Sequence, residues 1–203
     1  MLGRDRRPGA LSVIGAVSPP GGDLSDPVVQ ATLKVVKVFW ALVDHLANAR
    51  HFPAINWLLS YSLYKDNIRK YLAARVAEDF VDISQEAMHL LELESELLEI
   101  SRLVGVETLS AKDRLVLESA RSIREDFLHQ NAFHPQDTFT SLRKQYLMLR
   151  AILRFHRSAL KAVEDGVELG KVLGLAEREG IAKVKFLPED EARLGEAPAA
   201  LEG

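Results

Sequence analysis

The sequence has 203 residues, of which 47% are hydrophobic and 27% are charged. This length and composition are typical of a globular protein that holds one domain, or one domain and part of another. The formal net charge of −3 provides no positive field for nucleic acid, and the lack of cysteine excludes disulfides and thiolate metal sites.

The first predicted element is a short strand at residues 11–17, LSVIGAV, which ends at the turn sequence SPPGG. A continuous apolar run of this length is typical of a strand that is buried on both faces. Such a strand needs neighbours for its backbone hydrogen bonds, and the sequence offers no second convincing strand. The pattern therefore gives a first indication of an incomplete domain.

A long helix is predicted next, from Pro27 to about Ala49, with Ser25 and Asp26 as its start signal. Its apolar residues cover most of the circumference, which is typical of a helix enclosed in a larger body. Three charged residues interrupt the apolar run. We therefore expect a core helix and no direct insertion into a membrane.

Three more helices are predicted from apolar residues spaced three and four apart, at residues 82–104, 110–129 and 138–166. Gly105 is the expected end of the first, and Ser110 with Asp113 resembles a capping box at the start of the second. The apolar stripe of the last and longest helix consists of Leu142, Tyr146, Leu149, Leu153, Leu160 and Val163. Residues 188–203 are rich in Glu, Ala, Pro and Gly, and we expect a disordered tail there.

Spacing alone indicates no catalytic site. The glycines of SPPGGDLSDP lack the lysine of a phosphate-binding loop. His129, His134 and Asp137 do not have the spacing of zinc ligands, so we expect no metal site. The stretch RHFPAINWLLSYS, residues 50–62, combines a proline, two aromatic rings and an apolar run, and we interpret it as a loop with a specific task.

Five stretches, taken together and in order, resemble the catalytic A subunit of V/A-type rotary ATPases and ATP synthases. They are SVIGAVSPPGGDLSDPV, VKVFWAL, RHFPAINWLLSYSLY, IREDFLHQNAFHPQDT and LRKQYLMLRAILRF. The signature shared by the nucleotide-binding subunits of rotary ATPases is matched by Pro53, Ala54, Ile55, Asn56, Ser60 and Ser62. The resemblance covers about residues 11–187 and corresponds to the C-terminal third of that subunit.

The resemblance implies a mainly α fold: a C-terminal helical bundle, preceded by one strand and a helix left from the end of an α/β nucleotide-binding domain. Residues 1–75 would form the end of the nucleotide-binding domain, and residues 76–187 the helical C-terminal domain. In the family, the phosphate-binding loop, the magnesium ligands and the glutamate that orients the attacking water precede this region. We therefore expect the chain to be inactive alone, as a fragment, as half of a split subunit or as a remnant.

The resemblance also implies an adenine site built from three aromatic rings. Phe52 matches the position whose ring stacks on adenine, and Phe127 and Phe133 match two further rings that close the pocket. A ring stacked on a base contributes about 1–3 kcal/mol. All three would also serve as ordinary core residues, and this alternative is strongest for Phe127, which lies on an apolar helix face. The implied ligand is ATP or ADP with Mg²⁺, and the Mg²⁺ ligands are not expected on this chain.

A second set of residues is implied to contact the rotor. PGGDLSDP resembles the loop with which F-type beta subunits touch the rotating central stalk, and Asp23, Ser25 and Asp26 match its polar residues. Residues 106–113 lie where those subunits carry an acidic segment that transmits torque. Here only Glu107 and Asp113 are acidic and Lys112 reverses a charge, so a purely electrostatic contact is not expected there.

The expected function is therefore that of the C-terminal part of a catalytic A subunit, in ATP synthesis or hydrolysis coupled to proton or sodium transport. The implied partners are B subunits, the N-terminal part of the A subunit, the central stalk and nucleotide, with no nucleic acid. The implied location is cytoplasmic and peripheral to the membrane. The alternative is a truncated, non-catalytic helical interaction module derived from that subunit.

Overall fold

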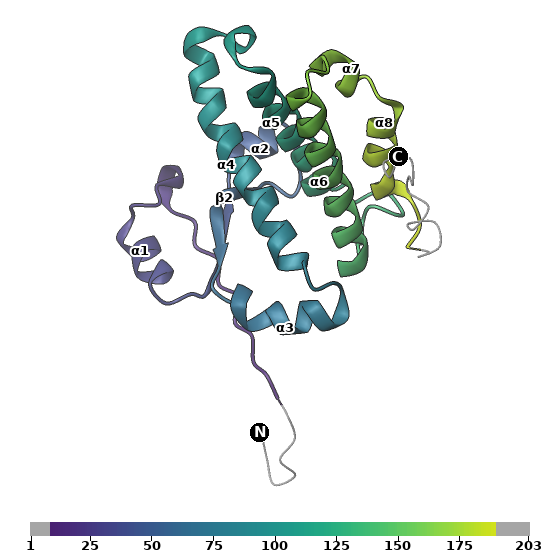
Figure 1. Cartoon of the computed structure of the whole chain (residues 1–203). Coiled ribbons are helices and arrows are strands. Elements are labelled where there is room, and N and C mark those ends of the chain that lie inside the picture. The colour runs from purple at the N-terminus through teal and green to yellow at the C-terminus, as the bar shows by residue number, and fades with distance from the viewer. Residues whose placement is uncertain (1–8, 190–203) are drawn as a thin grey trace.

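The computed structural model describes residues 9–189, and within them the chain is mostly helical (Figure 1). The α-helices are α1 (Pro27–Leu33), α2 (Asp44–Asn48), α3 (Lys65–Arg75), α4 (Phe80–Val104), α5 (Ala111–Ser122), α6 (Leu142–Glu164), α7 (Leu169–Leu173) and α8 (Ala176–Lys183). The strands are β1 (Val38–Leu42) and β2 (Ile55–Ser62). Shorter helical turns are η1 (Pro20–Gly22), η2 (Val106–Thr108) and η4 (Val184–Phe186), and η3 (Ile123–Leu128) is wound as a π-helix. The mainly α fold class is confirmed.

The strand predicted at residues 11–17 is wrong. These residues have no regular secondary structure, and the side chains of Leu11 and Ile14 are 90% and 89% exposed. A strand is stable only when its backbone groups pair with a neighbour. Within residues 9–189 the two strands pair with each other and not with this segment, so its apolar pattern has nothing to pack against.

The single helix predicted from Pro27 to Ala49 is also wrong. Its first turns form the helix α1, in which the Asp26 side chain accepts hydrogen bonds from the amides of Val28 and Val29 at 2.8 and 3.2 Å. The chain then turns into β1 and ends in the short helix α2. The VVKVFWA stretch is rich in β-branched and aromatic residues, which lose side-chain freedom in a helix and fit a strand well.

An antiparallel ribbon of β1 and β2 replaces part of that helix and part of the loop expected at residues 50–62. Val38 lies opposite Ser62 and Leu42 opposite Ile55, with an irregularity between Phe39 and Ala41. There the Ser60 hydroxyl accepts a hydrogen bond from the Ala41 amide at 3.0 Å and donates to the Asn56 carbonyl at 2.5 Å. The side chain thus satisfies the backbone groups that the irregular pairing leaves open.

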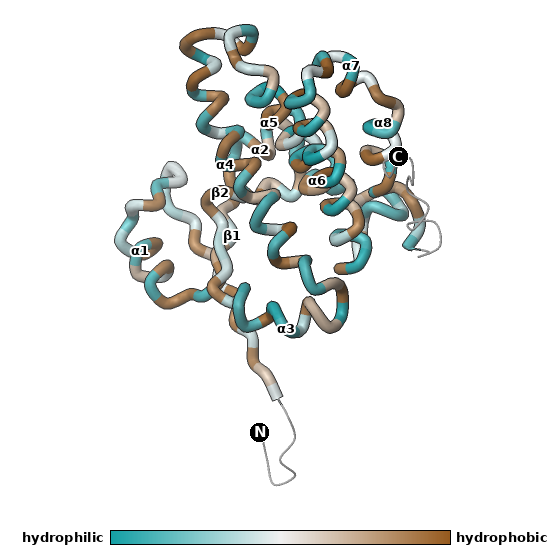
Figure 2. The backbone as a smooth tube through the Cα atoms, viewed as in Figure 1, coloured by the Kyte–Doolittle hydropathy of each residue, from teal (hydrophilic) through white to brown (hydrophobic). Residues whose placement is uncertain are grey.

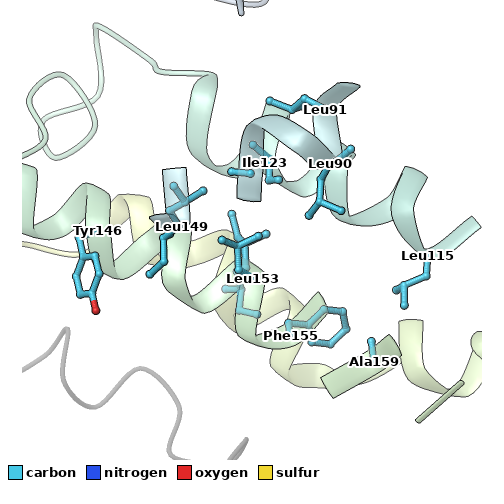
Figure 3. Close-up of a cluster of buried hydrophobic side chains, with 14 of the residues drawn as sticks. Leu90, Leu91, Leu115, Ile123, Tyr146, Leu149, Leu153, Phe155 and Ala159 are labelled. Carbon is cyan, nitrogen blue, oxygen red and sulfur yellow. The ribbon is translucent and has the colours of Figure 1, made fainter. Parts of the chain in front are cut away.

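The core lies in the bundle of α4, α5 and α6, which confirms the three helices predicted there. Gly105 ends α4 at φ 86°, a conformation that favours glycine, and the Ser110 side chain accepts from the Asp113 amide at the start of α5. Figure 2 shows hydrophobic and hydrophilic residues alternating along these helices. The buried side chains drawn in Figure 3 include Leu90, Leu91, Leu115, Ile123, Tyr146, Leu149, Leu153, Phe155 and Ala159.

The tail predicted to be disordered, residues 188–203, lies outside the described residues apart from its first two. Across residues 9–189, none of the helices has both the length and the apolar content that a membrane span requires.

Candidate functional site

Phe52 stands on a tight turn between α2 and β2. Arg50 has a φ of 58°, and the amide of His51 donates to the Leu46 carbonyl at 2.8 Å, which closes the turn. The Phe52–Pro53 peptide bond is cis. The His51 side chain is buried, whereas the Phe52 side chain is 50% exposed. The turn therefore uses one aromatic ring as an anchor and presents the next to solvent.

The His51 ring fixes this turn to η3. Its Nε2 lies 3.0 Å from the Arg124 carbonyl oxygen, so Nε2 carries the hydrogen and donates it. The ring centroid lies 5.6 Å from that of Trp57 and 5.2 Å from that of His129. Arg124 in turn pairs with the buried Glu94 of α4 at 3.0 Å. The turn with Phe52 is thus attached to the bundle through the π-helix.

Phe133 stands on the loop that follows η3, and Gln130 joins this loop to the Phe52 turn. The Gln130 amide donates to the Phe52 carbonyl at 2.7 Å, and its side chain donates to the Asp137 carbonyl at 2.7 Å. The buried carboxylate of Asp137 accepts from the Asn131 amide at 2.7 Å. Residues 129–137, here called the Phe133 loop, are therefore held at their base, while the side chain of Phe133 is 98% exposed.

Phe127 lies differently from the other two predicted adenine residues. It is on η3, partly buried, and packs against both hydrophobic clusters of the bundle. The structure thus brings the backbone of the Phe52 turn to the base of the Phe133 loop and places Phe127 in the packed layer beneath. Phe139, just beyond the Phe133 loop, is exposed as well and was not singled out by the sequence patterns. In the sequence, the position of Phe139 between two threonines is the feature that could have indicated an exposed ring.

The predicted rotor residues form a surface turn before α1. The carboxylate of Asp23 accepts from the Ser25 amide at 2.8 Å, and Asp26 caps α1. Hydrogen bonds from the side chain and then the backbone of Ser25 lower the pKa of Asp23 below the ordinary value of a carboxyl group. Asp23 and Ser25 are exposed, and Asp26 is partly exposed.

The charged groups beside the Phe133 loop were missed by sequence reasoning. Lys144 and Lys185 are buried, and their ammonium groups donate to backbone carbonyls. Burial lowers the pKa of Lys144. Burial, and then the charges of Lys185 and His51, lower the pKa of His129 at the start of the loop. No spacing pattern distinguishes a buried lysine from the exposed lysines that are the rule.

Neither the possible metal ligands of residues 9–189 nor the largest cavity described here involves the exposed rings of Phe52 and Phe133. In the part of the chain that the structure describes, no three His, Cys, Asp or Glu side chains come together to hold an ion. A cavity of about 300 Å³ is lined by residues of α6 and α7, including Phe155 and Val172, and neither Phe52 nor Phe133 lines it. The rings of Phe52 and Phe133 are thus both exposed at the surface of the molecule.

Comparisons with known proteins match two parts of the sequence to family models. Residues 69–173 match the C-terminal domain of V and A type ATP synthase, and residues 2–62 match the nucleotide-binding domain of the ATP synthase alpha/beta family. Relatives include V-type ATP synthase alpha chains of Thermoanaerobacter sp. (strain X514), 60% identical over 188 residues, and of Acetivibrio thermocellus, 57% identical over 190 residues. A V-type ATP synthase alpha chain 1 of Clostridium tetani is 58% identical over 188 residues.

These matches cover 93–94% of this chain and 32% of each relative, so the chain spans about a third of the length of the curated relatives it matches. The match to the C-terminal domain extends over more than half of the chain. It coincides with the bundle of α4, α5 and α6 and includes both η3 and the Phe133 loop. The chain belongs to the family of the C-terminal domain of V and A type ATP synthases.

Proposed function

We propose that this chain acts as the C-terminal part of the catalytic A subunit of a V/A-type rotary ATP synthase or ATPase. In this role it provides one wall of the adenine pocket and a helical domain that faces the rotor, for ATP synthesis or hydrolysis coupled to proton or sodium transport. The observation that carries the proposal is the hydrogen bond from the Gln130 amide to the Phe52 carbonyl at 2.7 Å. It joins the two backbone segments that carry the exposed rings of Phe52 and Phe133.

Exposed phenylalanine rings on anchored loops fit the base of a nucleotide. A purine has flat apolar faces, and stacking on an aromatic ring contributes about 1–3 kcal/mol. The backbone of both segments is held by buried groups, His51 on one side and Asp137 on the other. The rings would therefore meet the base without first ordering the chain, which lowers the entropic cost of binding. Phe127 would support this surface from the layer below.

The described residues fit the base of ATP or ADP better than its phosphates or Mg²⁺. Among residues 9–189, no three or more His, Cys, Asp or Glu side chains come together to hold an ion. We therefore assign to this chain the orientation of the base and no step of phosphoryl transfer. Bound Mg²⁺ would neutralise charge on the phosphates, and its ligands would come from other residues of the assembled subunit.

Apolar surface supports the proposal of further subunits. Leu11, Ile14, Trp40 and Leu42 are large, apolar and mostly exposed on the N-terminal part of the chain. Exposed apolar side chains that lie close together, as Trp40 and Leu42 do on β1, are typical of an interaction surface. We propose that residues 1–75 complete a nucleotide-binding domain with the remainder of an A subunit, next to a B subunit, and that residues 76–187 form the helical domain.

The assembled head would be cytoplasmic and peripheral to the membrane, with Asp23, Ser25 and Asp26 toward the central stalk.

Replacing the exposed ring tests the proposal directly. In a complex assembled with the remainder of an alpha chain and its neighbouring subunits, Phe133→Ala should raise the KM for ATP about 5-fold or more, because one stacking contact is lost. The kcat should change less than about twofold, since the ring binds substrate and transition state equally. Tyr71→Ala, which removes an exposed ring from α3, is the matched control and should leave both constants unchanged.

An unchanged KM in the Phe133→Ala complex would remove the adenine assignment. If instead the parent complex assembled with its subunits bound but had no ATPase activity, the alternative of a non-catalytic helical interaction module would stand.

A further inference from the structure

Two lysines of this chain are almost entirely removed from solvent. Lys144 on α6 is 0% exposed and Lys185 on η4 is 7% exposed. An ammonium group is costly to bury unless hydrogen bonds compensate for the lost water. Both lysines find these bonds at backbone carbonyl oxygens near the Phe133 loop, which makes them candidates for holding that loop.

Lys185 binds the place where η3 ends and the Phe133 loop begins. Its Nζ donates to the carbonyl oxygens of Glu125 and His129, both at 3.0 Å. The same Nζ lies 4.0 Å from the Oδ2 atom of Asp137, at the other end of the loop. One buried cation therefore lies between the last turn of the π-helix and both ends of the loop.

Lys144 holds the backbone on which Lys185 stands. Its Nζ donates to the carbonyls of Lys185 and Leu187 at 2.8 Å each, and lies 3.5 Å from the carbonyl of Gln136. The backbone that carries Lys185 is thus fixed to α6. Val184 on the same segment packs with Met148 of α6, next to Phe127.

The Phe133 side chain does nothing to hold its own loop, because it is 98% exposed. The conformation that presents the ring must therefore come from contacts at the base of the loop. Hydrogen bonds to a buried charged donor are stronger than bonds between neutral groups, and they fix a backbone more firmly. Lys185 makes two such bonds, and it lies beyond residue 173, where the match to the C-terminal domain family ends.

We propose that Lys185 is a positioning residue for nucleotide binding: it holds the carbonyls of Glu125 and His129 so that the Phe133 loop presents its ring to the base. This inference rests on the proposed function and extends the nucleotide site to a segment of the chain outside the Phe52 turn and the Phe133 loop. Lys144 acts one step further away, by holding the backbone of Lys185.

The test uses the assembled complex with Lys185→Met, which keeps much of the side-chain length and removes the charge and donors. The KM for ATP should rise about tenfold, as expected for lost hydrogen bonds to a charged group, with kcat changed less than about twofold. Amide hydrogen exchange should become faster within residues 129–137 and not in α4. Lys183→Met, which removes an exposed lysine two residues earlier, is the control and should change neither readout.

Phe133→Ala, measured in parallel, separates the two proposals. If it raises the KM while Lys185→Met leaves KM and loop exchange unchanged, the role of Lys185 is wrong and the proposed function stands. If neither variant changes the KM, the adenine site itself is wrong. If Lys185→Met fails to fold, Lys185→Arg is tested in its place. It keeps the positive charge and the N–H donors, and its KM for ATP should stay near that of the parent complex. A folded Lys185→Arg complex with protected loop amides and an unchanged KM supports the proposal, whereas a KM raised with unchanged loop exchange contradicts it.

Discussion

His156 is a buried titratable residue inside the helical bundle. Its Nδ1 lies 2.8 Å from the hydroxyl of Ser119, which joins α6 to α5. Burial lowers the pKa of His156, although the charge of Glu86 acts in the opposite direction. The folded chain therefore resists protonation of this ring, whereas the unfolded chain takes up a proton at the ordinary histidine pKa of about 6.5.

The stability of the chain should decrease as the pH falls below about 6.5, because the unfolded state then binds more protons than the folded state. His156→Gln keeps a polar side chain without a titrating ring, and its free energy of unfolding should depend less on pH between about 7.5 and 5.5. Urea unfolding at the two pH values measures the difference. The remaining dependence includes His129, whose pKa is also lowered. Equal pH dependence in parent and variant would contradict the role of His156.

At the scale of single residues, Phe52 and Phe133 could be placed in loops from the sequence, whereas the buried lysines could not be identified. Phe52 follows Arg50 and His51, and Phe133 lies between Asn131 and His134, so polar residues near both rings favour loops at the surface. Lys144 and Lys185 could not be found in the same way, since their partners are backbone carbonyls up to 60 residues away. Backbone carbonyls exist at every residue, so no sequence pattern identifies those that a lysine will bind.

At the scale of elements, α6 carries the core of the bundle. Leu149 is 2% exposed and lies among buried side chains from α4, α5 and η3 (Figure 3). Leu149→Asp would remove this packing and bury an unpaired carboxylate. We expect a loss of about 4 kcal/mol or more, compared with a total stability of about 5–15 kcal/mol for a typical domain.

Circular dichroism and thermal unfolding of Leu149→Asp measure this loss. Ser158→Asp places the same charge on an exposed position of α6 and should change the midpoint little. If the helical signal and midpoint of Leu149→Asp equalled those of the parent chain, Leu149 would not belong to the core.

Helices were predicted more accurately than strands because their signals are local. The caps at Asp26 and Ser110 and the glycine at Gly105 lie where the sequence placed them. A strand depends on a partner that is distant in sequence, and the pairing of Val38 with Ser62 joins residues of which one was assigned to a helix and the other to a loop. The same dependence explains residues 11–17, whose strand pattern lacks a partner among the described residues.

At the scale of the whole molecule, the turn before α1 and the helix α8 lie on opposite sides of the bundle (Figure 1). If Asp23, Ser25 and Asp26 face the central stalk, a cysteine at Asp23 should form crosslinks with cysteines on the long helices of the stalk and stop rotation. A cysteine at the exposed Glu179 of α8 is the control and should form none. A complex that rotates freely after oxidation, with Asp23→Cys uncrosslinked in every nucleotide state, would contradict the rotor contact.

The adenine surface is tested most directly by separating the base from the phosphates. Dissociation constants for ATP and for inorganic tripolyphosphate would be measured on the assembled complex, with the parent chain and with the double variant Phe52→Ala, Phe133→Ala. If the rings stack on the base, the variant should bind ATP at least about fivefold more weakly, whereas its affinity for tripolyphosphate should not change. Equal losses for both ligands, or no loss for ATP, would contradict the proposal that these two rings bind adenine.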